Sequence, residues 1–129
     1  MLNVTCAIIV KNNKILATRR SETMRHPLRW EFPGGKIESG ETPEECLHRE
    51  IMEELRIPLR IIKPLPPQQH CYENFSINLM PFLCEYVSGQ VVLTEHKEYR
   101  WCSREELLLL DWAEADRLIL EVLMKELSA

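Results

Sequence analysis

The sequence lacks any long hydrophobic run, and no segment approaches the roughly 18–20 apolar residues that a membrane-spanning helix requires. Its start, MLNVTCAIIVKNNK, has none of the ordered parts of a secretory signal. Long basic runs are also missing, and the formal net charge is −4, which argues against a nucleic acid polymer as a partner. We therefore expect a cytoplasmic protein that binds neither membranes nor nucleic acid polymers.

Paired cysteines are absent as well. The 5 cysteines are scattered, and no two of them form a Cys-x-x-Cys pair. This pattern argues against a disulfide framework and against a zinc ribbon. We interpret the cysteines as buried, reduced thiols rather than as metal ligands, and this includes the Cys71 of the His70-Cys71 pair.

What is present is the composition of an ordinary soluble domain, with 45% hydrophobic and 28% charged residues in a chain of 129. That length predicts a single domain, residues 1–129, with a sizeable core. The charge is uneven, because residues 14–29 are mainly basic and residues 38–54 are mainly acidic. A basic segment beside an acidic one suits an anionic ligand held through bridging cations, although two solvated faces of opposite charge would give the same composition.

Four segments have the apolar or alternating pattern of strands: residues 3–10, 14–20, 75–87 and 98–103. Asn12 and Asn13 separate the first two and predict a hairpin turn. Pro81 predicts that the third strand lies at an edge or contains a bulge. The prolines in residues 59–70 exclude a long central strand there.

Three segments have helical signals. The first begins with Thr42 as N-cap, Pro43 at the first helical position and Glu45 completing a capping box. Ser103 starts a short second helix, and residues 113–127 form an amphipathic C-terminal helix. Because strands lie before and between the two substantial helices, the first and the C-terminal one, we predict an α/β (α+β) fold with a mixed sheet between helices.

The first helix carries a cluster of acids at positions 50, 53 and 54, within the stretch REIMEEL. Spacings of three and four residues place Glu50, Glu53 and Glu54 on one side of the helix. Like charges at these spacings destabilise an exposed helix by about 0.2–0.5 kcal/mol per pair. A bound divalent cation would cancel this repulsion, and clustered carboxylates together with substrate phosphates are the oxygen ligands that Mg²⁺ prefers.

The segment GKIESGETPEECLHREIMEELRI, residues 35–57, resembles the Nudix box. The box runs Gly, five residues, Glu, seven residues, then Arg-Glu-aliphatic-x-Glu-Glu-x-Gly-aliphatic. Its specified positions are filled here by Gly35, Glu41, Arg49, Glu50, Ile51, Glu53, Glu54 and Ile57. With WEFPGGKIESGETP and EHKEYRW the resemblance extends over most of the chain. It implies one Nudix hydrolase domain, an α/β/α sandwich with a mixed sheet between the helices.

The chain departs from the box at Arg56, which occupies the final glycine position. Glycine there would let the backbone leave the helix in the left-handed region. Arg56 is therefore either strained in that region or, as we prefer, passes through a right-handed exit enforced by Pro58.

The resemblance also implies a metal site and its residues. Mg²⁺ is the expected cofactor, with Mn²⁺ as a substitute, and the expected ligands are Gly34, Glu50, Glu53, Glu54 and Glu95. Arg49 would orient the carboxylates, and either Glu50 or Glu95 would act as the base that deprotonates the attacking water. We interpret His96 as structural and His48 as facing solvent.

Three further residues resemble the MutT-like branch, whose members hydrolyse nucleoside triphosphates such as oxidised dGTP to a monophosphate and pyrophosphate. The resemblance implies that Arg20 contacts the substrate, that Phe32 lies against the base pocket and that Asp116 reads the base edge. Each has a simpler alternative: a surface charge, a core residue and an acid favoured by the helix dipole. An ionised Asp116 would accept hydrogen bonds from the N–H groups of an oxoguanine-like edge or an exocyclic amine.

The resemblance therefore favours an 8-oxo-dGTP diphosphatase that protects the nucleotide pool. Pyrimidine triphosphates such as CTP or methylated dCTP remain alternatives, because EHKEYRWCSREEL is also similar to relatives that act on them. A hydrolase of another nucleoside diphosphate derivative and a non-catalytic nucleotide-binding regulator are the rival classes. The sequence leaves a monomer and a homodimer equally open.

Overall fold

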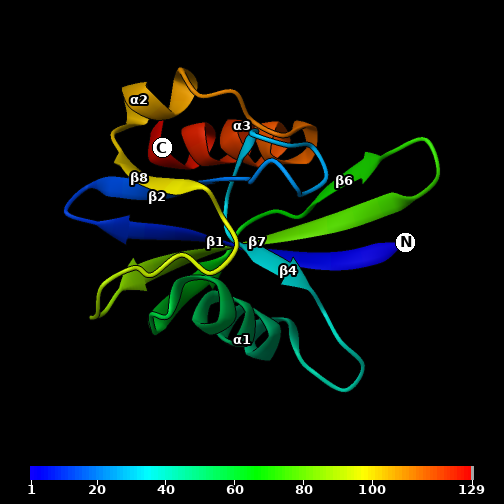
Figure 1. Ribbon diagram of the computed structural model, residues 1–129, viewed down its shortest axis with the longest axis horizontal. Helices are drawn as coiled ribbons and strands as arrows, with labels where there is room; N and C mark the ends of the chain where they lie inside the picture. Colours follow the sequence, from blue (N-terminus) through cyan, green and yellow to red (C-terminus); the bar gives the residue numbers. More distant parts are fainter. Residues whose placement is uncertain (129) are drawn as a thin grey trace.

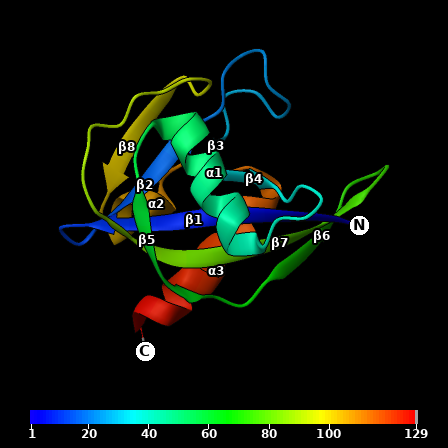
Figure 2. The same ribbon diagram turned by 90° about the horizontal axis from the view of Figure 1, so that it is seen from below.

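A mixed sheet lies between two layers of helices in the computed structural model, which describes residues 1–128 (Figure 1). The helix α1 covers one face of the sheet, and α2 and α3 cover the other (Figures 1 and 2). The strands are β1 (Leu2–Lys11), β2 (Lys14–Arg19), β3 (Trp30–Glu31), β4 (Gly34–Lys36), β5 (Leu59–Pro64), β6 (Gln68–Cys71), β7 (Ser76–Tyr86) and β8 (Glu98–Cys102). The helices are α1 (Pro43–Leu55), α2 (Arg104–Leu108) and α3 (Glu114–Ser128). The predicted fold class is confirmed.

The strand β1 organises the sheet. It pairs in parallel with β7, and on its other side it pairs antiparallel with both β2 and β4. The order β3-β2-β1-β7-β5 is extended by β6 on β7 and by β8 on β2. Because β4 joins the first half of β1, the glycines of β4 lie at the middle of the sheet, directly before the loop into α1.

Alternating side chains of β1 build both cores. Cys6 and Ile8 pack on the side of α2 and α3, whereas Ala7 and Ile9 pack on the side of α1. This is the period of two that a strand imposes, with both faces buried. On α1 the apolar stripe Leu47, Ile51 and Leu55 is fully buried against the second of these cores. One face of α1 is therefore fixed, and its polar residues have fixed directions.

The region of residues 59–70 forms two short strands, β5 and β6, which the sequence did not predict. Both pair with β7, so β7 is an inner strand and the edge position expected from Pro81 is wrong. Pro81 lies where β5 has ended and β6 has not begun, and its carbonyl accepts the N–H of Leu65. A bulge does occur, but in the partner strand, between Ile61 and Lys63.

Two other expectations concern the burial of the cysteines and the length of the apolar helices. Four cysteines are buried, as predicted, but Cys71 is exposed at the end of β6. All five are free thiols. Within residues 1–128, no helix is long and apolar enough to cross a membrane.

The start of α1 matches the predicted capping box, and its end does not match the preferred prediction. The Thr42 hydroxyl accepts the N–H of Glu45 at 3.1 Å, and the Glu45 carboxylate accepts the N–H of Thr42 at 2.8 Å. Arg56 is left-handed, with φ 60° and ψ 32°, so the right-handed exit is wrong. The reason is Ile57, which is fully buried, so the chain must turn sharply directly after the helix.

Replacing Arg56 by glycine is expected to stabilise the fold by about 1 kcal/mol, because glycine adopts the left-handed region without the strain of a Cβ atom. For a chain of this size, that raises the midpoint of thermal unfolding by about 3–5 °C. Arg56→Ala is the matched control, since it removes the exposed charge and keeps the strain. Equal midpoints for the two variants would contradict strain as the cause.

Candidate active site

Arg49 is the hub of the predicted acidic cluster. Its guanidinium forms a two-point hydrogen bond with Glu41, at 3.0 and 2.6 Å, and a further bond of 2.8 Å with Glu50. It also contacts the Glu53 carboxylate at 3.3 Å and the carbonyl of Lys36 at 3.2 Å. Arg49 therefore fixes the helix, the preceding loop and two of the acids relative to one another. Hydrogen bonding to Arg49 lowers the pKa of Glu41 to about 2.

The three acids of α1 have very different exposures. The side chain of Glu53 is 59% exposed, that of Glu50 is 18% exposed and that of Glu54 only 7%. Burial, the neighbouring Glu50 carboxylate and the charge of Glu31 together raise the pKa of Glu54 to about 10. One oxygen of Glu54, Oε2, is buried without a hydrogen-bond partner among the described residues. Unpaired buried carboxylate oxygens are unfavourable, so this atom is poised to accept a cation.

The predicted ligand Glu95 is brought to the same place by a loop between β7 and β8. The loop is fastened to the end of α1, because Thr94 donates from its amide to the carbonyl of Glu54 and from its hydroxyl to the carbonyl of Glu53. Glu95 is itself exposed, and its charge acts on Glu54. The four predicted carboxylates therefore converge at the carboxyl-terminal half of α1.

Two glycines of β4 leave room that no other residue would leave. A Cβ atom on Gly35 would lie 2.3 Å from the carboxyl carbon of Glu50, and one on Gly34 would lie 2.1 Å from the carbonyl oxygen of Thr5. The Glu50 carboxylate thus rests against bare backbone. Such an all-oxygen donor set, with an unpartnered carboxylate oxygen and an exposed carboxylate beside it, fits a hard divalent cation such as Mg²⁺.

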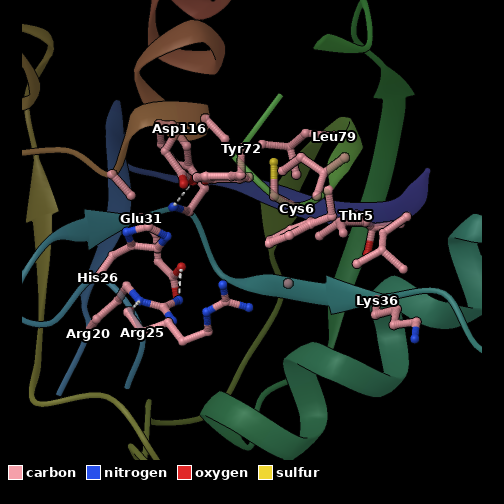
Figure 3. Close-up of a pocket in the computed structure, with 18 residues that line it drawn as sticks. Thr5, Cys6, Arg20, Arg25, His26, Glu31, Lys36, Tyr72, Leu79 and Asp116 are labelled. Atoms are coloured by element: carbon pink, nitrogen blue, oxygen red, sulfur yellow. Dashed lines mark hydrogen bonds and ion pairs between the residues drawn. The ribbon is translucent and has the colours of Figure 1, made fainter. Parts of the chain in front are cut away.

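Figure 3 shows a cavity of about 420 Å³, and one of its lining residues, Glu31, has a carboxylate oxygen within 4.8 Å of the Glu54 carboxylate. All three predicted substrate residues, Arg20, Phe32 and Asp116, line it. Phe32 is 3% exposed and stacks on Trp112 with ring centroids 4.6 Å apart, so it is both a core residue and part of the wall. In Figure 3, Arg20 lies at the opposite end of the cavity from Lys36.

Asp116 differs from its predicted state. It is buried, and its Oδ1 atom accepts the amide N–H of Phe32 at 2.9 Å. Burial and the charge of Glu31 raise the pKa of Asp116 well above its ordinary value. The neutral carboxyl is thereby favoured, and it can donate a hydrogen bond as well as accept one. Burial thus works against the ionised, acceptor-only form that was expected from the sequence.

Two residues of the site were not placed there from the sequence, Glu31 and His96. Glu31 bonds Arg20 at 2.6 Å through one oxygen and His96 at 2.7 Å through the other. With Glu54 they form a group whose ligand atoms all lie within 4.8 Å of one another. Glu31 precedes Phe32 in the motif WEFPGG, and this adjacency to a predicted site residue was the available signal. His48 is exposed, as predicted.

The model of the NUDIX domain family matches residues 1–123 of the chain. The chain belongs to this family. It is accordingly a hydrolase that acts on phosphoric anhydride bonds of nucleotide substrates, and members of the family generally use divalent metal ions.

Among characterised relatives, this NUDIX protein is 34% identical to the CTP pyrophosphohydrolase of Escherichia coli K12, over 96% of its own length and 92% of the relative's. It is also 34% identical to the 8-oxo-dGTP diphosphatase of the same strain, over 72% of each chain. Among solved structures, it superposes on the MutT protein from Methanosarcina mazei Go1 with a TM-score of 0.89 and 27% identity, covering 99% and 96% of the two chains.

Proposed function

We propose that this NUDIX hydrolase is a Mg²⁺-dependent nucleoside triphosphate pyrophosphohydrolase that releases nucleoside monophosphate and pyrophosphate, with 8-oxo-dGTP as its substrate. The observation that supports the proposal most directly is the juxtaposition of an acidic cluster with a cavity that holds Arg20, Phe32 and Asp116. The cluster suits a polyphosphate with its cation, and the cavity suits a nucleobase.

In this proposal Glu50, Glu53, Glu54, Glu95 and the carbonyl of Gly34 hold the cation. Bound there, Mg²⁺ would lower the pKa of coordinated water and neutralise charge on the phosphates. Arg49 keeps Glu50 and Glu53 in place through the contacts described above. Glu50 or Glu95 accepts the proton of the attacking water. Of these two, Glu50 is the better held, by Arg49 on one side and by the backbone of Gly35 on the other.

In the cavity, Phe32 offers an aromatic wall and Asp116 a polar edge. A neutral Asp116 donates and accepts at once, so it can pair with the O6 and N1–H atoms of oxoguanine. Arg20 is held by Glu31, lines the same cavity and contributes positive charge for an anionic substrate.

CTP is the second candidate substrate. The relative that acts on CTP is similar over 96% of this chain, compared with 72% for the E. coli 8-oxo-dGTP diphosphatase. A neutral Asp116 also fits cytosine, donating to N3 and accepting from the exocyclic amine.

The test is Mg²⁺-dependent release of pyrophosphate from a panel of canonical, oxidised and methylated nucleoside triphosphates. We expect the highest kcat/KM for 8-oxo-dGTP, exceeding that for dGTP by at least about tenfold, a small free-energy difference for a site that reads base edges. A maximum for CTP or 5-methyl-dCTP would select the second candidate. Release of monophosphate from nucleotide sugars or dinucleoside polyphosphates, with none from triphosphates, would overturn both.

A further inference from the structure

A line of polar contacts connects the cavity with α1. It runs from Arg20 through Glu31 to His96, with N···O distances of 2.6 and 2.7 Å. The same His96 nitrogen, Nε2, lies 3.8 Å from Glu54 Oε1. One histidine ring thus stands between a carboxylate that lines the cavity and a carboxylate of the acidic cluster (the cavity end of the line is seen in Figure 3).

The line is shielded from solvent over most of its length. The His96 side chain is 0% exposed, and those of Glu31 and Arg20 are 16% and 18% exposed. Each Glu31 oxygen has one charged or polar partner, Arg20 on Oε1 and His96 on Oε2. Within residues 1–128 no other side chain is hydrogen-bonded to Oε2, so His96 is the side chain that holds this oxygen, while Arg20 holds the other. Buried charges require such partners, and losing one is unfavourable.

The ring is not held by a second hydrogen bond. His96 Nδ1 is buried and has no hydrogen-bond partner in the described part of the chain. If His96 only filled space, its Nε2 atom would not need to lie near two carboxylates, as it does here with Glu31 and Glu54. The backbone around it is fixed separately, by Lys97 N–H donating to Arg19 and by Thr94 bonding to α1. The backbone that carries the His96 ring is therefore fixed, and Nε2 is the ring atom that makes its polar contacts.

We propose that His96 is a positioning residue that couples filling of the cavity to the arrangement of the acidic cluster. A base in the cavity contacts Arg20 and Glu31, orders the Glu31–His96 hydrogen bond and so holds the ring against Glu54. The acids of α1 are then ordered for the cation before the phosphates arrive, which is positive coupling between two adjoining sites. This inference rests on the proposed function, because it assumes a nucleobase in the cavity and a divalent cation at the acids.

Two substitutions separate this role from packing. In His96→Gln the amide nitrogen reaches about as far as Nε2 and can still donate to Glu31. In His96→Asn it reaches only about as far as Nδ1, so the bond to Glu31 is lost. Both variants introduce the same carboxamide group, and both remove the aromatic ring. Similar thermal midpoints for the two variants would show that any difference between them comes from the position of the donor.

The measurement is Mn²⁺ affinity of the full chain, from electron paramagnetic resonance of free Mn²⁺, with and without a free nucleoside. 8-Oxo-2′-deoxyguanosine and cytidine are the probes, because neither has a phosphate that could touch the cation. We expect the nucleoside to tighten Mn²⁺ binding about threefold to tenfold in the wild type and in His96→Gln. In His96→Asn we expect no change with nucleoside.

Steady-state kinetics give a second readout. His96→Asn should lower kcat about tenfold to a hundredfold, as loss of a ligand-supporting contact does, with KM within about threefold of the wild type. His96→Gln should restore most of the loss.

Coupling in His96→Asn equal to that of the wild type, or no coupling in the wild type with either nucleoside, would overturn the inference. A substrate panel without hydrolysis of any triphosphate would overturn the proposed function alone, since the Mn²⁺ measurement needs no turnover.

Discussion

Glu53→Gln is expected to lower kcat by about two to four orders of magnitude while the protein remains folded. A cation ligand contributes several kcal/mol of transition-state stabilisation, and each 1.36 kcal/mol is a factor of ten in rate. Stability should change little, because the Glu53 side chain is 59% exposed and its contact with Arg49, at 3.3 Å, is the longest of the contacts that Arg49 makes with Glu41, Glu50 and Glu53. The carbonyl of Glu53, which anchors Thr94, is unaffected by the substitution.

The measurement is Mg²⁺-dependent pyrophosphate release, with circular dichroism and the thermal midpoint as checks of folding. Glu44→Gln is the matched control, since it removes an exposed carboxylate from the first turn of the same helix, away from the cluster. We expect its kcat to stay within about twofold of the wild type, because it makes the same chemical change outside the site. Turnover of Glu53→Gln at the wild-type level would show that the acids of α1 do not hold the catalytic cation.

Local signals predicted the parts of the fold that depend on neighbours in the sequence. Thr42, Pro43 and Glu45 determine the start of α1 whatever packs against it, and Asn12 and Asn13 accept the positive φ of a tight turn. The strands β5 and β6 could not be found this way. They are strands because β7 offers them hydrogen bonds, and residues 59–70 have prolines where an isolated strand would have none.

The end of α1 illustrates the same limit. Pro58 was the strongest local signal, but it restricts Ile57 and leaves Arg56 free. What decides the conformation of Arg56 is the burial of Ile57, a tertiary requirement that the local pattern does not contain.

In the site, the Nudix box located the acids of α1, and the structure brings Glu95 to them through Thr94. What could not be predicted is the difference in environment between acids with the same side chain. Glu53 and Glu54 are adjacent in sequence, but one is mostly exposed and the other almost buried. Helix spacing gives a direction for each side chain of α1. Whether solvent reaches Glu53 or Glu54 depends on the loop between β7 and β8, which packs against the end of the helix. Roles that depend on contacts between distant segments, as for Glu31 and His96, were missed for the same reason.

The burial of Glu54 gives the fold a pH-dependent weakness that a cation should remove. The folded protein favours the neutral carboxyl, with a pKa of about 10, whereas the unfolded chain ionises near the ordinary value of about 4.5. Between these values the folded state binds more protons than the unfolded state, so stability falls as pH rises. Asp116, whose pKa is also raised, contributes in the same direction. Buried thiols such as Cys84, with a pKa of about 12, add a similar effect only above about pH 8, where unfolded cysteine ionises.

We therefore expect the free energy of unfolding of the metal-free protein to decrease from pH 5 to pH 8, by up to about 1.4 kcal/mol per pH unit from Glu54, with Asp116 adding to the decrease. Saturating Mg²⁺ should reduce this slope, because it favours the ionised Glu54. In Glu54→Gln the metal-free slope should be clearly smaller than that of the wild type, with Asp116 providing the remainder, and Mg²⁺ should no longer change it.

Urea denaturation in EDTA and in excess Mg²⁺, at several values of pH between 5 and 8, measures these slopes. Glu53→Gln is the control, because an exposed carboxylate should leave the metal-free slope at its wild-type value. A metal-free slope in Glu54→Gln equal to that of the wild type would mean that Glu54 is ionised in the folded protein without any cation. The repulsion among the acids of α1 would then be carried by the helix itself, and a divalent cation would not be needed to explain how so many carboxylates share one face of it.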